Sequence, residues 1–234
     1  MSIADNLALI RHRITTAAHR AGRNPDGIAL MAVCKTFPAE AINEAYAAGQ
    51  RLFGENRVQE FADKFPAVSN LPGARFHMIG HLQSNKATKA AEIFHAVDSI
   101  DSAKLAQRLN DAAQKLDKTL EVLIEVNVGG EEAKSGLSPD SPEIDAILGH
   151  APDWMQLNIR GLMTVPPFTD DPGGARPYFR RLRELRDRLV TRNFPAISLG
   201  ILSMGMSHDF EIAIEEGSTS VRIGTAIFGE RSKS

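Results

Sequence analysis

The sequence is poor in cysteine and lacks long apolar runs, and both absences exclude whole classes of protein. Cys34 is the only cysteine among 234 residues, so an internal disulfide framework and a cysteine-rich zinc site are excluded. No segment approaches the roughly 20 apolar residues of a membrane-spanning helix. Residues 1–23 have apolar positions at helical spacing with charges between them, unlike a signal peptide. We therefore expect a cytoplasmic protein with no membrane partner.

An excess of positive charge is also missing. The chain carries 27 Lys and Arg residues against 29 Asp and Glu residues, a net charge of −2. This balance provides no long-range attraction for nucleic acid, so we predict no nucleic-acid partner. Hydrophobic residues make up 43% of the chain and charged residues 24%, which is ordinary for a globular protein with a sizeable core.

Short β-branched or apolar runs alternate with helical patterns along the chain. The runs predict eight strands, at 28–35, 51–55, 75–80, 94–100, 120–128, 157–165, 196–205 and 219–229. Apolar residues recur at intervals of three and four between them, which indicates amphipathic helices. The clearest of these helical segments are 38–49, 102–116 and 175–190.

This alternation implies parallel strands joined by helical crossovers, the α/β class. Eight such units in a chain of 234 residues match a (β/α)8 TIM barrel. We predict a single domain over 1–234, with the barrel at 28–230 and an additional N-terminal helix at 1–23 against its floor or side. An open doubly wound sheet is the alternative, but the first strand is not followed by G-x-G-x-x-G.

The last two predicted strands end in turns that favour an anion. Ser203 and Gly205 lie in "SMGMS", and Gly224 and Thr225 lie in "RIGT". Backbone N–H groups, helix starts and hydroxyls together bind phosphate without a lysine, and barrels often hold phosphate after strands seven and eight. The alternative is that each segment is an ordinary tight turn.

Two cations lie beside this predicted cradle. Arg222 precedes Gly224 by two positions, so strand alternation points both to one face. It is either a ligand donor or half of a buried ion pair with an acid such as Glu125. Lys35 closes the first strand, which neighbours the eighth in a barrel. It either leans out to solvent or is held inside as a nucleophile toward an aldehyde.

A phosphate cradle, a nucleophilic lysine and an arginine together suggest pyridoxal 5′-phosphate (PLP), whose phosphate, aldehyde and ring nitrogen need such partners. With these residues in view, the chain resembles the YggS/PROSC family of PLP homeostasis proteins along nearly its whole length. The motifs that carry the resemblance are "AVCKTFP", "FGENRVQE", "FHMIGHLQSNK", "EEAKSGL", "IRGLMTV" and "LSMGMSHDFEIAIEEGSTSVRIGTAIFG".

The resemblance implies a barrel like the N-terminal domain of alanine racemase, with PLP held as a Schiff base on Lys35 and an arginine, Arg222, at the pyridine nitrogen. Asn56 and His77 match motif positions near the cofactor. Two residues depart from the family pattern, Cys34 in place of a serine and Arg57 in place of a tyrosine. The implied phosphate contacts are Ser203, Gly205, Gly224 and Thr225.

Other features have plainer interpretations. His77 and His81 are four apart, but they straddle a strand end, so we predict no metal site. Met163 and Met204 are packing residues that, at strand ends, are also candidates for contact with the cofactor ring. Arginines between 176 and 188 are interrupted by acids and apolar residues, which favours a solvated amphipathic helix over a site for RNA or an acidic partner.

We therefore predict a PLP-binding protein of intracellular PLP homeostasis, monomeric, without efficient catalytic turnover, with PLP-dependent apo-enzymes as candidate recipients of the cofactor. One alternative is a PLP-dependent amino-acid racemase or related PLP enzyme. The other is a barrel enzyme that binds a phosphosugar without a covalent bond, which the cradle alone would permit.

Overall fold

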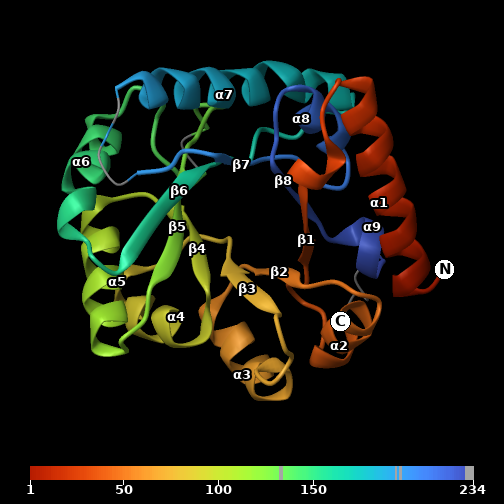
Figure 1. Cartoon of the computed structure of the whole chain (residues 1–234), viewed down its shortest axis with the longest axis horizontal. Helices are drawn as coiled ribbons and strands as arrows, with labels where there is room; N and C mark the ends of the chain where they lie inside the picture. Colours follow the sequence, from red (N-terminus) through yellow and green to blue (C-terminus); the bar gives the residue numbers. More distant parts are fainter. Residues whose placement is uncertain (132–133, 193, 195–196, 230–234) are drawn as a thin grey trace.

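Eight parallel strands close into a barrel in sequence order, and the last strand pairs with the first (Figure 1). The computed structural model describes residues 1–131, 134–192, 194 and 197–229. The predicted (β/α)8 barrel is thus confirmed. The strands are β1 (Ala29–Val33), β2 (Leu52–Glu55), β3 (Arg75–Met78), β4 (Ala96–Ile100), β5 (Leu120–Glu125), β6 (Leu157–Met163), β7 (Ile201–Ser203) and β8 (Ser220–Ile223).

Helices surround the barrel as an outer layer (Figure 1). They are α1 (Ile3–Arg20), α2 (Ala39–Ala47), α3 (Val58–Val68), α4 (Ala87–Ile93), α5 (Ala103–Lys115), α6 (Pro142–His150), α7 (Arg176–Thr191), α8 (Phe210–Glu215) and α9 (Thr225–Phe228). Short 3-10 helices lie at Pro25–Gly27, Ser84–Lys86, Ala151–Asp153 and Pro172–Ala175.

The last two strands are shorter than the sequence predicts. β7 covers only Ile201–Ser203, and β8 ends at Ile223, after which Gly224 caps α9. Glycine and serine have low strand propensity, so the segment 197–200 and the turn after Ser203 leave the ladder. Position 196, where the seventh strand was expected to begin, lies outside the described residues. So do residues 230–234, at the end of the predicted domain.

The N-terminal helix packs against the side of the barrel. Ser2 caps α1 in a reciprocal arrangement with Asp5, which satisfies amide groups at the helix start. Leu7, Ile10 and Ile14 form its buried face. This face contacts α8, α9 and α2, and Figure 1 shows α1 beside α9.

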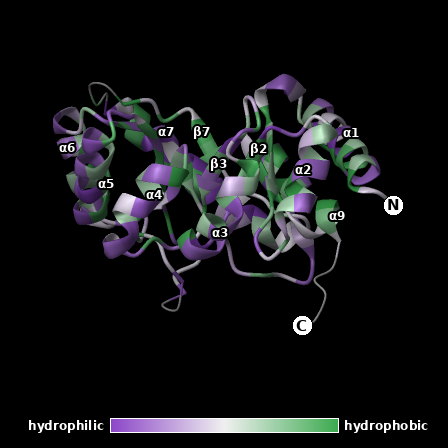
Figure 2. Cartoon of the chain, turned by 90° about the horizontal axis from the view of Figure 1, so that it is seen from below, coloured by the Kyte–Doolittle hydropathy of each residue, from purple (hydrophilic) through white to green (hydrophobic). Residues whose placement is uncertain are grey.

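Strand alternation separates an apolar layer from a polar interior. On β3, Phe76 points to the helices, where its ring lies 4.9 Å from Phe61 and 5.4 Å from Phe53. The alternate residues Arg75 and His77 point into the barrel. Figure 2 shows hydrophobic residues concentrated on the strands and on the inward sides of the helices. The main apolar core therefore lies between strands and helices.

The arginine-rich helix is amphipathic, as predicted. Its buried face consists of Phe179, Leu182, Leu185 and Leu189. Ion pairs join Arg176, Arg180 and Arg183 to the buried carboxylate of Glu216, just after α8. These arginines therefore fasten α7 to α8.

None of the helices within the described part of the chain combines the length and the apolar character that crossing a membrane requires.

His95 is expected to make the fold sensitive to acid. Burial, together with the charges of Lys118 and Arg75, lowers the pKa of this imidazole to about 4. Its Nδ1 accepts a hydrogen bond from the Phe76 N–H at 3.1 Å. Because the unfolded ring binds a proton near its ordinary pKa, the neutral ring stabilises the fold above that value. This stability is lost as the pH falls toward the folded-state pKa.

We predict that the free energy of unfolding of the wild type falls by about 1–3 kcal/mol more than that of His95→Gln on acidification. The range allows for solvent screening around a partly exposed ring. Urea unfolding of both proteins at neutral pH and near pH 4.5 measures the difference. Identical pH dependence in the two proteins would exclude this role for His95.

Candidate functional site

A pocket of about 540 Å³ opens at the carboxyl ends of the barrel strands. We call it the upper pocket. Barrel proteins place their sites at this end, because the loops that follow the strands converge there. Five predicted site residues line it, and they are Lys35, Asn56, Arg222, Gly224 and Thr225.

Lys35 reaches the upper pocket from the turn that follows β1. The turn lies beside the end of β8, because Ala32 is aligned with Ile223 in the closing pair of strands. The Lys35 side chain is half-buried and lines the same pocket as Gly224. The predicted meeting of the first and eighth strand ends is therefore present in the structure.

Arg222 is buried and held at both ends of its guanidinium group. Nη1 donates to Ser203 Oγ at 2.7 Å, and Nη2 donates to the Thr164 carbonyl at 2.7 Å. Burial lowers the pKa of Arg222, while the nearby charges of Asp98 and Glu125 oppose that effect. An arginine nevertheless keeps its proton in proteins. It therefore brings a fixed positive charge to the floor of the upper pocket.

Two turns form the wall of the pocket beside Arg222. The turn after β7 contributes Met206 and Ser207, and the turn after β8 contributes Gly224 and Thr225. The Ala226 N–H donates to Ser207 Oγ at 3.5 Å, which joins the two turns. A Cβ at Gly224 would lie 3.2 Å from the Val33 carbonyl oxygen, so this wall leaves little room for a side chain.

The other predicted residues of the seventh strand end lie behind this wall. Ser203 and Met204 are fully buried, and Ser203 accepts the hydrogen bond from Arg222. Gly205 has φ +94, and a Cβ there would lie 2.5 Å from Ala213 Cβ, so this glycine allows α8 to pack closely. Met163 is fully buried at the end of β6, aligned with Ser203.

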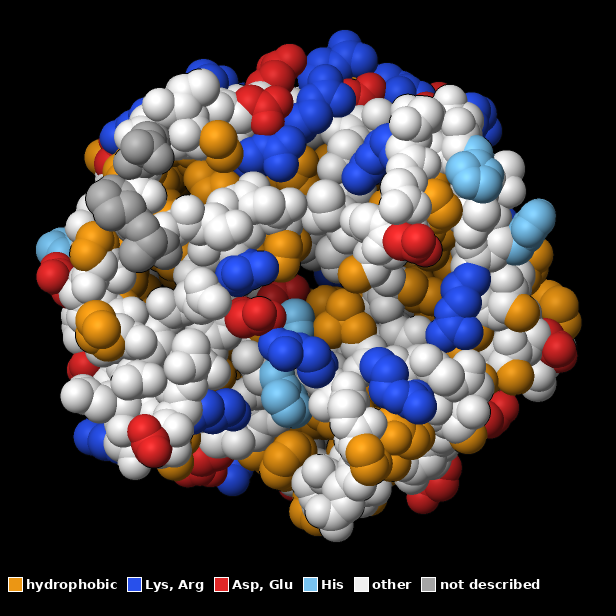
Figure 3. All heavy atoms as spheres, viewed as in Figure 1, with side chains coloured by type: hydrophobic (Ala, Val, Ile, Leu, Met, Phe, Trp, Pro, Cys, Tyr) orange, Lys and Arg blue, Asp and Glu red, His pale blue; other side chains and the backbone are white. Residues whose placement is uncertain are grey.

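His77 lies deeper in the barrel than its motif position suggests. It lines a separate cavity of about 520 Å³ toward the amino ends of the strands, which we call the lower cavity. Figure 3 shows a hollow at the centre of the barrel, surrounded by basic, acidic and histidine side chains. His81 lines the upper pocket instead, with Nδ1 3.1 Å from Asp101. Throughout the described ranges, no group of three or more His, Cys, Asp or Glu residues is placed to hold a metal ion.

A charged cluster holds the turn that carries Lys35. On the outer side of the barrel, Lys64 Nζ donates to Glu55 at 2.9 Å, to Glu60 at 2.8 Å and to the Cys34 carbonyl at 3.3 Å. Glu60 also accepts from the Thr36 N–H at 2.6 Å. We call this the Lys64 cluster.

The Lys64 cluster supports a strained backbone. Thr36 has φ +68, a conformation that costs a β-branched residue about 1–3 kcal/mol. Burial raises the pKa of the Glu55 carboxyl, and the hydrogen bond and charge of Lys64 act against that effect. Lys64 therefore pairs with a buried carboxylate and holds the Cys34 carbonyl, while its partner Glu60 holds the Thr36 N–H on the other side of Lys35.

Polar atoms in the upper pocket lack partners within the described residues. Asn56 Oδ1 and Glu125 Oε2 are both buried and make no hydrogen bond there. The other oxygen of Glu125 accepts from Ser135 Oγ at 2.9 Å. Buried polar groups are normally satisfied, so the pocket is suited to a polar ligand rather than to apolar packing.

Sequence reasoning missed several residues of the upper pocket. Met206 and Ser207 belong to the same "SMGMS" segment as the predicted Ser203 and Gly205, but they lie one to four positions further on. Lys134 and Ser135 come from "EEAKSGL", of which residues 132–133 lie outside the described residues. Each pair belongs to a motif that the sequence analysis had already singled out, and that motif was the available signal.

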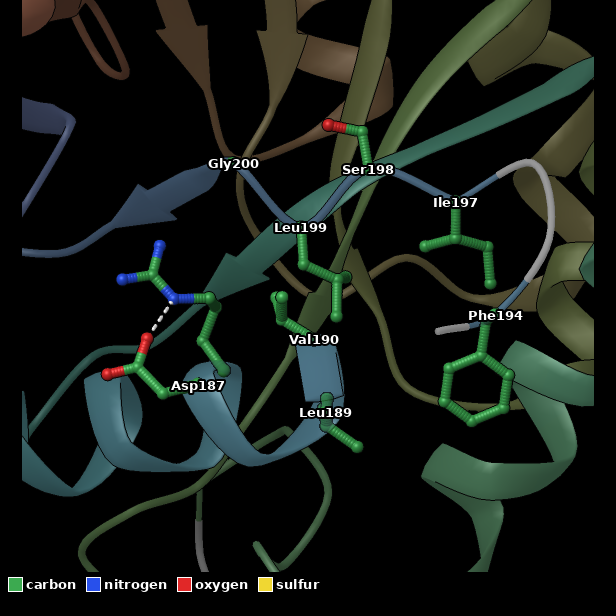
Figure 4. Close-up of a pocket in the computed structure, with 9 residues that line it drawn as sticks. Asp187, Leu189, Val190, Phe194, Ile197, Ser198, Leu199 and Gly200 are labelled. Atoms are coloured by element: carbon green, nitrogen blue, oxygen red, sulfur yellow. Dashed lines mark hydrogen bonds and ion pairs between the residues drawn. The ribbon is translucent and has the colours of Figure 1, made fainter. Parts of the chain in front are cut away.

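Another hollow, of about 680 Å³, lies between the end of α7 and the segment before β7 (Figure 4). Leu189, Val190 and Phe194 give it an apolar lining. Its charged side chains, Arg186 and Asp187, pair with each other at 2.6 Å. We assign no chemistry to this hollow.

The fold and the upper pocket together define a ligand-binding (β/α)8 barrel. Residues 6–232 match the family model described as alanine racemase, N-terminal domain. A pyridoxal phosphate homeostasis protein of Aquifex aeolicus is 44% identical over 99% of both chains. A protein of the same name from Pseudomonas aeruginosa is 46% identical over 98% of this chain and 96% of that protein.

Solved structures agree with these sequence matches. PipY of Synechococcus elongatus, solved with PLP bound, superposes with a TM-score of 0.84 at 38% identity over 97% of this chain and all of that chain. Alanine racemase of Streptomyces coelicolor has a TM-score of 0.71 at 21% identity, covering 94% of this chain and 58% of that chain, and supports the fold alone. The chain therefore belongs to the alanine racemase N-terminal domain family and, within it, to the pyridoxal phosphate homeostasis proteins.

We predict that Lys64→Met lowers the free energy of unfolding by about 3 kcal/mol, because it leaves the buried carboxylate of Glu55 unpaired. Lys104→Met, at an exposed position on α5, is the matched control and should change stability little. The double variant Lys64→Met/Glu55→Gln should recover part of the loss, because the unpaired charge is gone. Equal denaturant midpoints for Lys64→Met and Lys104→Met would contradict this account.

Proposed function

We propose that this protein binds PLP in the upper pocket and acts in intracellular PLP homeostasis. The observation that carries the proposal is the convergence of Lys35, Arg222 and the Gly224–Thr225 turn on one pocket. A reactive amine, a hydrogen-bond donor for a ring nitrogen and an anion-binding turn are the partners that PLP needs. The names of the relatives and the PLP-bound structure of PipY support the same function.

In this proposal, each pocket residue has a separate task. The Lys35 amine condenses with the aldehyde of PLP, which forms a Schiff base and releases one water molecule. The guanidinium group of Arg222 donates to the pyridine nitrogen. The turns that carry Ser207, Gly224 and Thr225 receive the phosphate through N–H groups and hydroxyls. Asn56, with an unsatisfied buried oxygen, supplies a further polar contact.

The remaining predicted residues act at a distance from the ligand. Ser203 orients Arg222 by accepting its Nη1 hydrogen bond. Gly205 and Met204 shape the turn after β7, and Met163 packs beneath it. We assign these three to the support of the pocket rather than to direct contact with PLP.

The arrangement favours a carrier or regulator over a racemase. PLP supplies an electron sink for carbanion chemistry when its ring nitrogen is protonated, and Arg222 is a donor that keeps this nitrogen unprotonated. Racemisation also needs acid–base groups on both faces of the cofactor. The chain has two tyrosines. Tyr46 donates to the Pro72 carbonyl at 2.8 Å, and Tyr178 is partly buried against the core, so neither lines the upper pocket.

We further propose that residues 1–234 form one monomeric domain that works in the cytoplasm and passes PLP to apo-enzymes. The closed barrel and α1 share one apolar core, and this supports a single domain. A phosphosugar-binding barrel enzyme remains the non-covalent alternative, and a covalent lysine adduct distinguishes the two.

Borohydride reduction tests the role of Lys35. We predict visible Schiff-base absorbance in the purified protein and, after reduction, PLP fixed to the peptide that contains Lys35. Lys35→Ala should lose both signals while its far-UV circular dichroism is unchanged. Lys134→Ala, which removes another lysine of the same pocket, is the matched control and should keep the adduct. A covalent adduct that persists in Lys35→Ala would refute the assignment.

Deuterium exchange at Cα tests the absence of turnover. We expect little exchange across a panel of amino acids and no accumulation of the opposite enantiomer, because Arg222 weakens the electron sink. Tyr178→Phe should behave like the wild type. Rapid exchange with multiple turnovers that disappears in Lys35→Ala would favour the racemase alternative instead.

A further inference from the structure

The lower cavity is a polar chamber inside the barrel, below the upper pocket. Its volume of about 520 Å³ lies within the range of small-molecule sites. The interior of an eight-stranded barrel is normally filled by side chains. Here the amino-terminal half leaves space between Arg75, His77, Asp98, Glu121 and Arg160.

Two polar atoms on the wall of this chamber are left unsatisfied. His77 Nε2 and Arg160 Nε are both buried, and neither has a hydrogen-bond partner among the described residues. A buried donor or acceptor without a partner costs about 1–3 kcal/mol. Both residues line the lower cavity, so a molecule in the cavity is positioned to satisfy them.

The charged groups on the cavity lining are the carboxylates of Asp26, Asp98 and Glu121 and the guanidinium groups of Arg75 and Arg160. Arg75 pairs with Glu121 at 2.7 Å, and His77 Nδ1 lies 3.0 Å from Asp98. Arg160 forms no ion pair with a carboxylate of the described chain. A guanidinium group matches a carboxylate in geometry as well as in charge. Among the charged groups of this lining, Arg160 is therefore a cation open to an anion, and its Nε is buried without a partner.

His77 adds a second requirement for the ligand. A carboxylate only accepts hydrogen bonds, so Nδ1 carries the hydrogen that faces Asp98. In the neutral ring Nε2 is then an acceptor, and in the charged ring it is a donor. A hydroxyl group satisfies Nε2 in either state, because it both donates and accepts.

We propose that the lower cavity is a second ligand site, which binds a small hydroxy acid with its carboxylate on Arg160 and its hydroxyl on His77. This site is distinct from the upper pocket. The two share no lining residue, and Lys35 and Arg222 line only the upper one. Binding in the lower cavity therefore does not depend on the proposed function.

Titration of the PLP-loaded protein with three matched probes tests the site. Lactate has both groups, propionate lacks the hydroxyl, and lactamide lacks the charge. With ionic strength held constant, lactate should shift the NMR signals of the His77 ring in a saturable way. It should bind at least about tenfold more tightly than either analogue, a difference of about 1.4 kcal/mol. Equal shifts with all three probes, or none with lactate, would overturn the proposal.

Variants distinguish binding in the lower cavity from a general effect of anions on the protein. Arg160→Met should weaken lactate binding about tenfold or more. If this variant does not fold, Arg160→Lys replaces it, because lysine keeps the positive charge but lacks the planar guanidinium group that matches a carboxylate. Arg108→Met, at an exposed position on α5, is the matched control and should bind like the wild type. Visible absorbance should be unchanged in all three, so loss of PLP binding would be recognised separately. Full lactate affinity in both Arg160 variants would show that lactate binds without Arg160 and would overturn the proposal.

Discussion

The pairing of β1 with β8 is the constraint on which the rest of the structure depends. It closes the sheet and aligns Ala32 with Ile223. Because parallel strands end at the same edge, this closure brings the turn of Lys35 next to the turn of Gly224, although nearly the whole chain separates them. An open sheet with the same strands would leave the amine and the anion-binding turn at opposite edges.

Arg222 depends on that closure and in turn organises three strand ends. Its guanidinium group bonds to Ser203 at the end of β7 and to Thr164 after β6, while its own strand is β8. Below it, the charge of Asp98 acts on Arg222, and the same carboxylate holds His77. One buried cation thus lies between the upper pocket and the lower cavity, and it fixes the floor of the first.

The sequence was sufficient for the order of elements and for the residues at the closing strand ends. Lys35, Arg222 and Gly224 could be placed together because strand alternation and barrel closure determine which way they face. Alternation gives the direction of a side chain but not its depth along the barrel. His77 was expected near the cofactor from its motif position, and in the structure it lines the lower cavity. The Lys64 cluster was not foreseen, because its contacts join a helix to a turn across the outer side of the sheet.

The position of Cys34 turns the chain's only thiol into a natural reporter. Its side chain is fully buried beside Glu55, one residue before Lys35, and burial raises the pKa of the thiol well above its ordinary value. Such a thiol reacts only when its surroundings open. The rate at which a thiol reagent labels the native protein therefore reports how often the turn that carries Lys35 opens. No engineered probe is needed, since no other cysteine contributes to the signal.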